Sequence, residues 1–213
     1  MLTLPEHLLL IALHDSRGTV HPAAFLALDI GLRAAILSEL RLQGRLQTSA
    51  SGHMRRNPDG CEPTGFPVLD RALDVLAAQP QPGPTKDWLL ALESGLPEVR
   101  AALTEMLASR GILGQADKER IGLPGSITHP MLDETAEMDM KQRLADAVDG
   151  DPNETSPRLG ALIALAASCN LVYAAFEPAQ RDVALARADW VAKRDAISRA
   201  LREVVAQTEG TWN

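Results

Sequence analysis

Apolar residues recur along this chain at helical spacing, interrupted by short runs rich in glycine, proline and polar residues. This periodicity predicts helices over residues 5–13, 22–43, 67–78, 85–92, 96–110, 133–148, 159–176 and 179–208. Residues 44–48 and 54–56 are expected to form short strands, and residues 112–128 a second hairpin. The pattern therefore predicts a mainly α fold, a single helical domain with a central apolar helix bundle and one or two small β-hairpins.

Two of the predicted helices are apolar enough to need a particular explanation. The helix over 22–43 has apolar residues on nearly all sides, which is typical of a helix buried at the centre of a domain. The segment 159–176 is nearly long enough to span a bilayer. Ser168, Cys169, Asn170 and many alanines lower its apolarity, so it is expected to be a buried core helix.

Composition limits the classes of protein to which the chain can belong. Its 213 residues are 46% hydrophobic, which suits one domain over residues 1–213. The net charge of −7 argues against a nucleic-acid partner. The chain starts without the basic segment of a secretory signal, and its two cysteines, Cys61 and Cys169, are far apart. We expect a cytoplasmic protein with at most transient peripheral membrane contact.

Two segments of the chain look alike. One begins with Arg33 and two alanines and runs to Gly44, and the other begins with Arg100 and two alanines and runs to Gly111. A glycine just past a helix is the usual left-handed stop, because it lacks the Cβ that penalises a positive φ. Two arginines presented in the same way can bracket an anionic group, so the repeat favours the binding of a phosphate or a headgroup over catalysis.

The surroundings of the two arginines leave an alternative open. Asp29 precedes Arg33 by one helical turn, so a local ion pair explains Arg33 as well as ligand binding does. Arg100 has no carboxylate four residues away on either side, and we expect it to be freer to meet an external anion.

Other candidate chemistry is weak. The run His14-Asp15-Ser16 has the residue types of a catalytic triad, but adjacent residues cannot align nucleophile, base and orienting group. The histidines and cysteines lack the spacing of metal ligands, and no glycine-rich phosphate loop is present. We therefore expect a protein that is not an enzyme and needs no cofactor or metal.

Several motifs, taken in order along the chain, resemble the Golgi phosphoprotein 3 family. They are Leu2-Thr3-Leu4 with Glu6, Gly31-Leu32-Arg33, Leu37-Ser38-Glu39-Leu40, Gly44-Arg45-Leu46-Gln47, Met54-Arg55-Arg56, Pro63-Thr64-Gly65, Trp88-Leu89, Val99-Arg100, Gly111-Ile112-Leu113 and Thr128-His129-Pro130. Their shared order covers nearly the whole chain. The arginine-rich, alanine-rich composition indicates a bacterial-type member.

The resemblance implies a helical domain that binds phosphatidylinositol 4-phosphate and the cytoplasmic tails of membrane proteins. The family pocket uses a tryptophan and three arginines. Arg33 and Arg100 match two of the arginines, the third falls at Pro97, and the tryptophan falls near Ala24, with Phe25 beside it as an aromatic stand-in. Headgroup-binding residues are thus expected to be Arg33, Arg100 and Phe25.

Three functions follow from these expectations. The first is a non-enzymatic module that binds an anionic phospholipid or another phosphate ligand, a peripheral membrane adaptor. The alternative is a protein-interaction scaffold that has lost lipid binding, which the acidic charge favours. A weaker third reading is a nucleic-acid binder that uses Arg45, Arg55 and Arg56, and the net charge opposes it.

Overall fold

The chain folds into a mainly helical domain, described by a computed structural model over residues 2–13, 18–60, 62–114, 129–133 and 135–210. The first half comprises α1 (Leu4–Ala12), η1 (Pro22–Ala24), α2 (Leu28–Leu42), β1 (Leu46–Thr48), β2 (His53–Arg56), α3 (Pro67–Ala77), β3 (Gly83–Pro84), α4 (Thr85–Gly95) and α5 (Val99–Ser109). The second half comprises α6 (Thr135–Asp149), α7 (Pro157–Ser168), α8 (Val172–Ala175), η2 (Pro178–Gln180), α9 (Arg181–Ala192) and α10 (Ala196–Gly210). The prediction of a mainly α single domain is confirmed.

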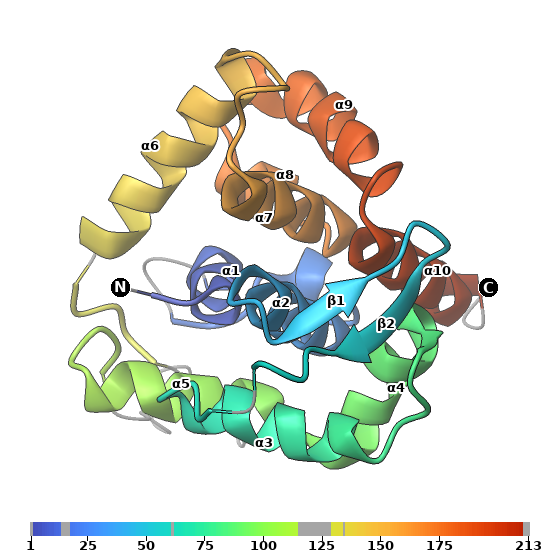
Figure 1. The fold of residues 1–213 in the computed structure, drawn as a ribbon. Coiled ribbons are helices and arrows are strands. Elements are labelled where there is room, and N and C mark those ends of the chain that lie inside the picture. The colour runs from blue at the N-terminus through green and yellow to red at the C-terminus, as the bar shows by residue number, and fades with distance from the viewer. Residues whose placement is uncertain (1, 14–17, 61, 115–128, 134, 211–213) are drawn as a thin grey trace.

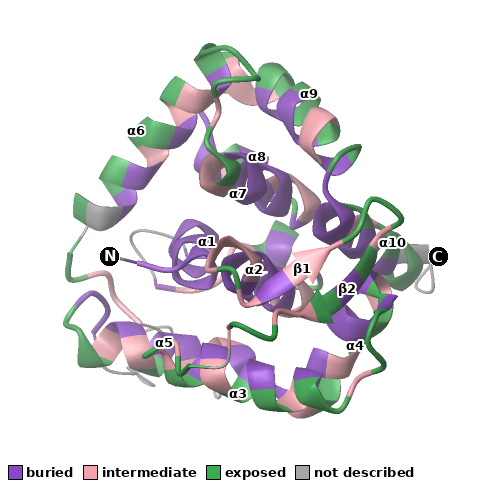
Figure 2. Ribbon diagram, in the orientation of Figure 1, coloured by how far each residue is buried: buried purple, intermediate pink, exposed green. Residues whose placement is uncertain are grey.

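Helices α1 and α2 lie at the centre of the molecule, and the other helices surround them (Figure 1). Every residue of α1 is buried, and α2 packs against α1, α4, α5, α7 and α10. Figure 2 shows these two helices almost entirely in the buried class, whereas α3, α6 and α9 expose their outer faces. The all-round apolar pattern of the segment around α2 therefore marked the centre of the core correctly.

The first predicted hairpin is confirmed. Strands β1 and β2 pair antiparallel, with Leu46 opposite Arg56, and the short β3 adds a third antiparallel strand. Gly44 has a φ of +72° and Gly111 a φ of +71°, so both glycines adopt the left-handed conformation that the repeated segments predict. The second predicted hairpin lies mostly outside the described residues, and at its border Leu113 bridges to Met131.

The predicted helix over 22–43 is wrong at its start. A 3-10 turn at Pro22–Ala24 precedes α2, and the segment between them continues with tight turns, in which the Phe25 and Ala27 N–H groups donate to the carbonyls of Pro22 and Ala24. This start leaves Phe25 62% exposed on the surface.

The segment predicted as one core helix over 159–176 ends at Ser168. Asn170 has a φ of +58°, a conformation that asparagine tolerates better than most residues, and the Leu171 N–H donates back to the Ala166 carbonyl. The shortened α7 is buried as predicted. No helix within the described ranges is both long and apolar enough to cross a membrane.

The C-terminal helix predicted over 179–208 is also divided. Asp195 accepts hydrogen bonds from the backbone N–H and the hydroxyl of Ser198, and its carboxylate pairs with Arg41 of α2 at 2.6 Å. This arrangement caps the start of α10 and separates it from α9. In the sequence Asp195 looks like one more charge on an alternating surface, which is why its capping role was missed.

Candidate functional site

Arg100 and Phe25, two of the three predicted site residues, meet at the surface. The guanidinium carbon of Arg100, in the first turn of α5, lies 5.6 Å from the centre of the Phe25 ring. A cation at this distance from an aromatic face is attracted by the ring. The ring of Phe25 is largely exposed and Leu26 beside it is 59% exposed, so the pair forms an apolar projection next to a positive charge.

Both residues line an open cavity of about 630 Å³, called here the Phe25–Arg100 cavity. Its apolar wall includes Leu9 of α1 and Val20. Among the described residues, its charged lining consists of Arg100 with two carboxylates, those of Asp29 and Glu98. The cavity is large enough for a headgroup-sized guest, but its lining is more acidic than the sequence led us to expect.

The expectation that Arg100 is free to meet an external anion is wrong. Its Nε donates to Oδ1 of Asp29 at 2.9 Å, and its Nη2 forms an ion pair with the same oxygen at 2.8 Å. The Arg100 side chain is 28% exposed and that of Asp29 is 43% exposed, so the pair is accessible to solvent. Asp29 therefore pairs with a residue 71 positions away, and not in the local ion pair with Arg33 that helical spacing suggested.

Arg33 lies beneath this cavity and does not line it. Its side chain is buried, and it donates to the carbonyl of Leu96 from Nε at 3.3 Å and from NH2 at 3.0 Å, and to the carbonyl of Pro97 at 3.3 Å. These carbonyls follow α4, where a cation is favourable because helix C-termini expose unpaired acceptors. Since Pro97 also lines the cavity, Arg33 supports the cavity wall from behind.

Burial affects the charge of Arg33 as well as its contacts. Removal from water lowers the pKa of the guanidinium below its usual value, and the carboxylates of Asp29 and Glu93 act in the opposite direction. The two arginines singled out by the repeat therefore have different surroundings. One is a buried structural cation and the other is an accessible cation with a carboxylate partner.

Of the remaining positions that the family motifs selected, some line the Phe25–Arg100 cavity and others are buried in the core. Ala24, where the family tryptophan falls, is fully buried, and Phe25 next to it faces the surface. His129 lines the cavity as well, and its Nδ1 lies 3.2 Å from the Gly114 carbonyl. The sequence contained His129 within a family motif, but nothing in its local pattern placed it beside Arg100.

Nucleophilic and metal-binding chemistry finds little support among the described residues. Burial raises the pKa of the Cys169 thiol to about 12, so this group stays protonated and unreactive at neutral pH. Over the described ranges, no group of three or more histidine, cysteine, aspartate or glutamate side chains is placed to hold a metal ion.

The fold is a helical domain with an open cavity, the Phe25–Arg100 cavity, that is lined by both apolar and charged residues. The chain belongs to the Golgi phosphoprotein 3 (GPP34) family, whose sequence profile matches residues 4–208. It is also 30% identical, over 164 residues, to the vacuolar protein sorting-associated protein 74 of Eremothecium gossypii. That match covers 67% of this chain and 48% of the relative, so it spans about half of the fungal protein.

Proposed function

We propose that this protein is a non-enzymatic peripheral membrane adaptor that binds the phosphate of an anionic lipid headgroup, such as that of phosphatidylinositol 4-phosphate, in the Phe25–Arg100 cavity. One observation carries the proposal: an accessible guanidinium and an exposed aromatic ring meet at the rim of an open cavity. The exposed Phe25 and Leu26 side chains would enter the apolar boundary of the bilayer while Arg100 meets the phosphate.

The carboxylate of Asp29 sets the affinity of such a site. A phosphate that reaches Arg100 has to replace Asp29 as its partner, and Glu98 adds a second negative charge to the lining. Both effects weaken the binding of an anion. The proposal therefore predicts weak, reversible membrane contact, and it assigns Arg33 the role of holding the wall at Leu96 and Pro97.

A co-sedimentation experiment with vesicles tests this function. Neutral phosphatidylcholine vesicles are compared with vesicles that also contain phosphatidylinositol 4-phosphate. Arg100→Ala is expected to weaken binding to the anionic vesicles roughly tenfold or more, because a charge-assisted hydrogen bond is lost. The matched control is Arg202→Ala, which removes the same charge from another partly exposed Arg–Asp pair, that with Asp189. Equal effects of the two substitutions would refute the site.

The second candidate function is a scaffold that binds a protein segment with cationic and apolar side chains, such as the tail of a membrane protein. The observation that favours it is that, over the described part of the chain, the carboxylates of Asp29 and Glu98 outnumber Arg100 in a cavity with apolar walls. The two functions predict opposite effects for Asp29→Asn. This change frees Arg100 and strengthens binding to anionic vesicles if the guest is a phosphate, but weakens binding if the guest is a cationic peptide. Asp189→Asn is its matched control.

A further inference from the structure

A second cavity, of about 600 Å³, lies between the N-terminal segment, the end of α5, α6 and the start of α7. Three arginines line it, Arg110, Arg143 and Arg158, together with one aspartate, Asp139. It is called here the three-arginine cavity. Within the described ranges it shares no lining residue with the Phe25–Arg100 cavity, and its described lining has the opposite balance of charge.

Two of these arginines pair with buried carboxylates that lie on the side of the arginines away from the cavity. Glu6 accepts from NH1 of Arg110 at 2.7 Å, and Glu39 accepts from NH1 and NH2 of Arg158 at 2.7 and 2.8 Å. The Glu6 side chain is fully buried and the Glu39 side chain is 3% exposed, and neither lines the cavity. The arginine side chains are partly exposed, 36% for Arg110 and 28% for Arg158.

As far as contacts between described residues go, these ion pairs fix the arginines without using all their donors. A guanidinium has five N–H donors, of which the bonds to Glu39 take two in Arg158 and the bond to Glu6 takes one in Arg110. Arg143 is held on the surface of α6 by Asp139, at 3.0 Å, and its side chain is 56% exposed. The arrangement is a set of pre-positioned cations with donors left for a guest.

The start of α7 adds to the positive potential. Ser156 caps this helix by accepting from the Leu159 N–H, and both residues line the cavity. The N-terminus of a helix carries a partial positive charge and favours anions. Arg158 lies within the first turn of α7, so the partial charge of the helix and the guanidinium act on the same space.

His7 supplies an observation of a different kind. It lines the cavity and is 7% exposed, so its imidazole lies at the wall beside the arginines and is positioned to respond to a guest that they hold.

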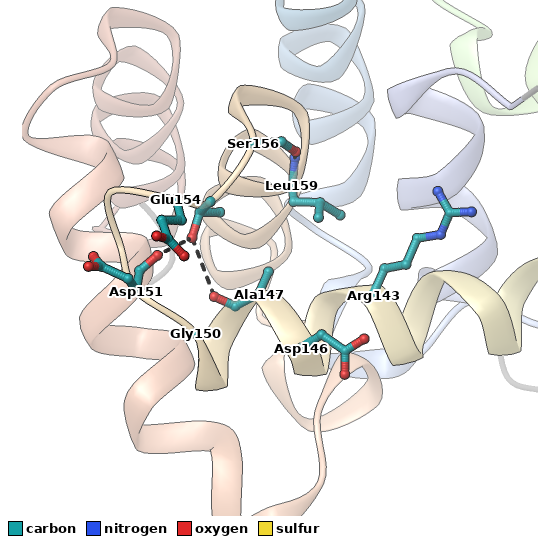
Figure 3. A pocket seen from close by; sticks show the side chains of 9 residues that line it. Arg143, Asp146, Ala147, Gly150, Asp151, Glu154, Ser156 and Leu159 are labelled. Atoms are coloured by element: carbon teal, nitrogen blue, oxygen red, sulfur yellow. Dashed lines mark hydrogen bonds between the residues drawn. The ribbon is translucent and has the colours of Figure 1, made fainter.

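A neighbouring cavity has a more acidic lining than the three-arginine cavity. Figure 3 shows it between α6 and the start of α7, with Arg143 at the opposite end from Asp151 and Glu154. It encloses about 380 Å³ and shares Arg143, Ser156 and Leu159 with the three-arginine cavity. Its carboxylates repel an anion, so the space on the other side of Arg143, next to Arg158, is the favourable one.

We propose that the three-arginine cavity binds a phosphomonoester whose apolar part lies against Leu2 and Met140. The phosphate accepts hydrogen bonds from the arginines, whose planar, multiply donating groups suit its oxygens. The apolar wall formed by Leu2 and Met140 accommodates a carbon skeleton attached to the phosphate. The same chemistry occurs in soluble phosphorylated metabolites and in the headgroup of phosphatidic acid.

The test measures the binding of phenyl phosphate, glycerol 3-phosphate and dihexanoyl phosphatidic acid to the full chain by NMR. The imidazole resonances of His7 and the Nε–Hε resonances of Arg110 and Arg158 are expected to shift and saturate. Arg143→Ala is expected to weaken binding about fivefold to tenfold, because it removes an exposed cation without unpairing a buried carboxylate. Arg202→Ala, the matched surface control, is expected to leave binding unchanged.

The outcomes distinguish a lipid from a soluble metabolite as the source of the phosphate. They also distinguish binding in this cavity from binding in the Phe25–Arg100 cavity. Tighter binding of dihexanoyl phosphatidic acid assigns the site to a lipid, and tighter binding of phenyl or glycerol phosphate assigns it to a soluble metabolite. Arg100→Ala leaves either result intact, because Arg100 lines the other cavity. Absence of saturable shifts at His7 and the arginines, or equal effects of Arg143→Ala and Arg202→Ala, would overturn the proposal.

Discussion

Replacing His7 by glutamine is expected to remove a pH dependence from the stability of this protein. Burial and, to a smaller extent, the positive charge of Arg158 lower the pKa of the His7 imidazole from 6.5 to about 4. The carboxylates of Glu6 and Glu39 and a hydrogen bond with the backbone of Thr3 act in the opposite direction but do not compensate. The native state therefore keeps this side chain neutral at pH values where the unfolded chain protonates it.

The sign and size of the effect follow from proton linkage. Between pH 6.5 and about 4 the unfolded state binds more protons at His7 than the native state does, so the free energy of unfolding falls as the pH falls. At about pH 5 the unfolded imidazole is almost fully protonated and the native one is still mostly neutral. Because the two pKa values differ, the free energy of unfolding at this pH is about 2 kcal/mol lower than at about pH 7.5.

Urea unfolding of the wild type and of His7→Gln at these two pH values measures the effect. At both pH values the stabilising contribution of Glu39 is present, and it changes with pH only below both of these values. Burial raises the pKa of that carboxyl, but hydrogen bonds from Arg158, Leu4 and Gln43 outweigh the effect and lower it, so its stabilising contribution is lost only below its ordinary pKa of 4.5.

On acidification the free energy of unfolding of the variant is expected to fall by about 2 kcal/mol less than that of the wild type, whatever the stability of the variant at neutral pH. His53→Gln, which replaces an exposed histidine of β2, serves as the control and should retain the wild-type pH dependence. Indistinguishable pH dependence of His7→Gln and the wild type would refute the reasoning, as would an NMR titration of native His7 with a midpoint near 6.5.

Two further predictions concern the core beside the Phe25–Arg100 cavity. Arg33→Met is expected to destabilise the fold by about 1–3 kcal/mol, measured by urea unfolding, because the carbonyls after α4 lose their buried donor; an unchanged midpoint would contradict this structural role. Gly31→Ala is expected to lower the melting temperature, since a Cβ there would lie 2.1 Å from Sγ of Cys169 and overpacking costs about 1–3 kcal/mol. Cys169→Ala in the same chain should restore most of that loss, and failure to do so would show that the clash lies elsewhere.

The helical content was predictable because burial imposes a regular apolar period on each helix. The capping box of Thr3 and Glu6 is present, with the Thr3 N–H donating to the Glu6 carboxylate at 2.7 Å. The glycines at 44 and 111 end their helices as predicted. The breaks before α2, after α7 and before α10 were missed because backbone turns and capping contacts, such as that of Ser198 with Asp195, set them, and the apolar period does not.

The candidate site was predictable only in part. The repeated arginine pattern and the family motifs selected Arg100 and Phe25, which do meet. Helical spacing suggested Arg33 as the partner of Asp29, but the chain after α4 places carbonyls within reach of Arg33 and brings Arg100 to Asp29. Local spacing describes contacts within a helix and carries no information about which other helix packs against it.

The three-arginine cavity could not be predicted from the sequence either, because local spacing does not reveal which helices pack together. Arg110, Arg143 and Arg158 come from three different helices or helix ends and are far apart in the sequence. Nothing in the residues next to each of them distinguishes it from an ordinary surface cation. Only the packing of α6 and α7 against α1 brings them to one space, with Glu6 and Glu39 behind them.

The most direct measurement of the central claim is an NMR titration of the arginine Nε–Hε resonances with soluble dihexanoyl phosphatidylinositol 4-phosphate. If the Phe25–Arg100 cavity holds the headgroup, the Arg100 resonance shifts and saturates as the phosphate replaces Asp29, and Asp29→Asn lowers the concentration needed for half-saturation. An Arg100 resonance that stays unchanged while the protein binds vesicles containing the same lipid would contradict the account.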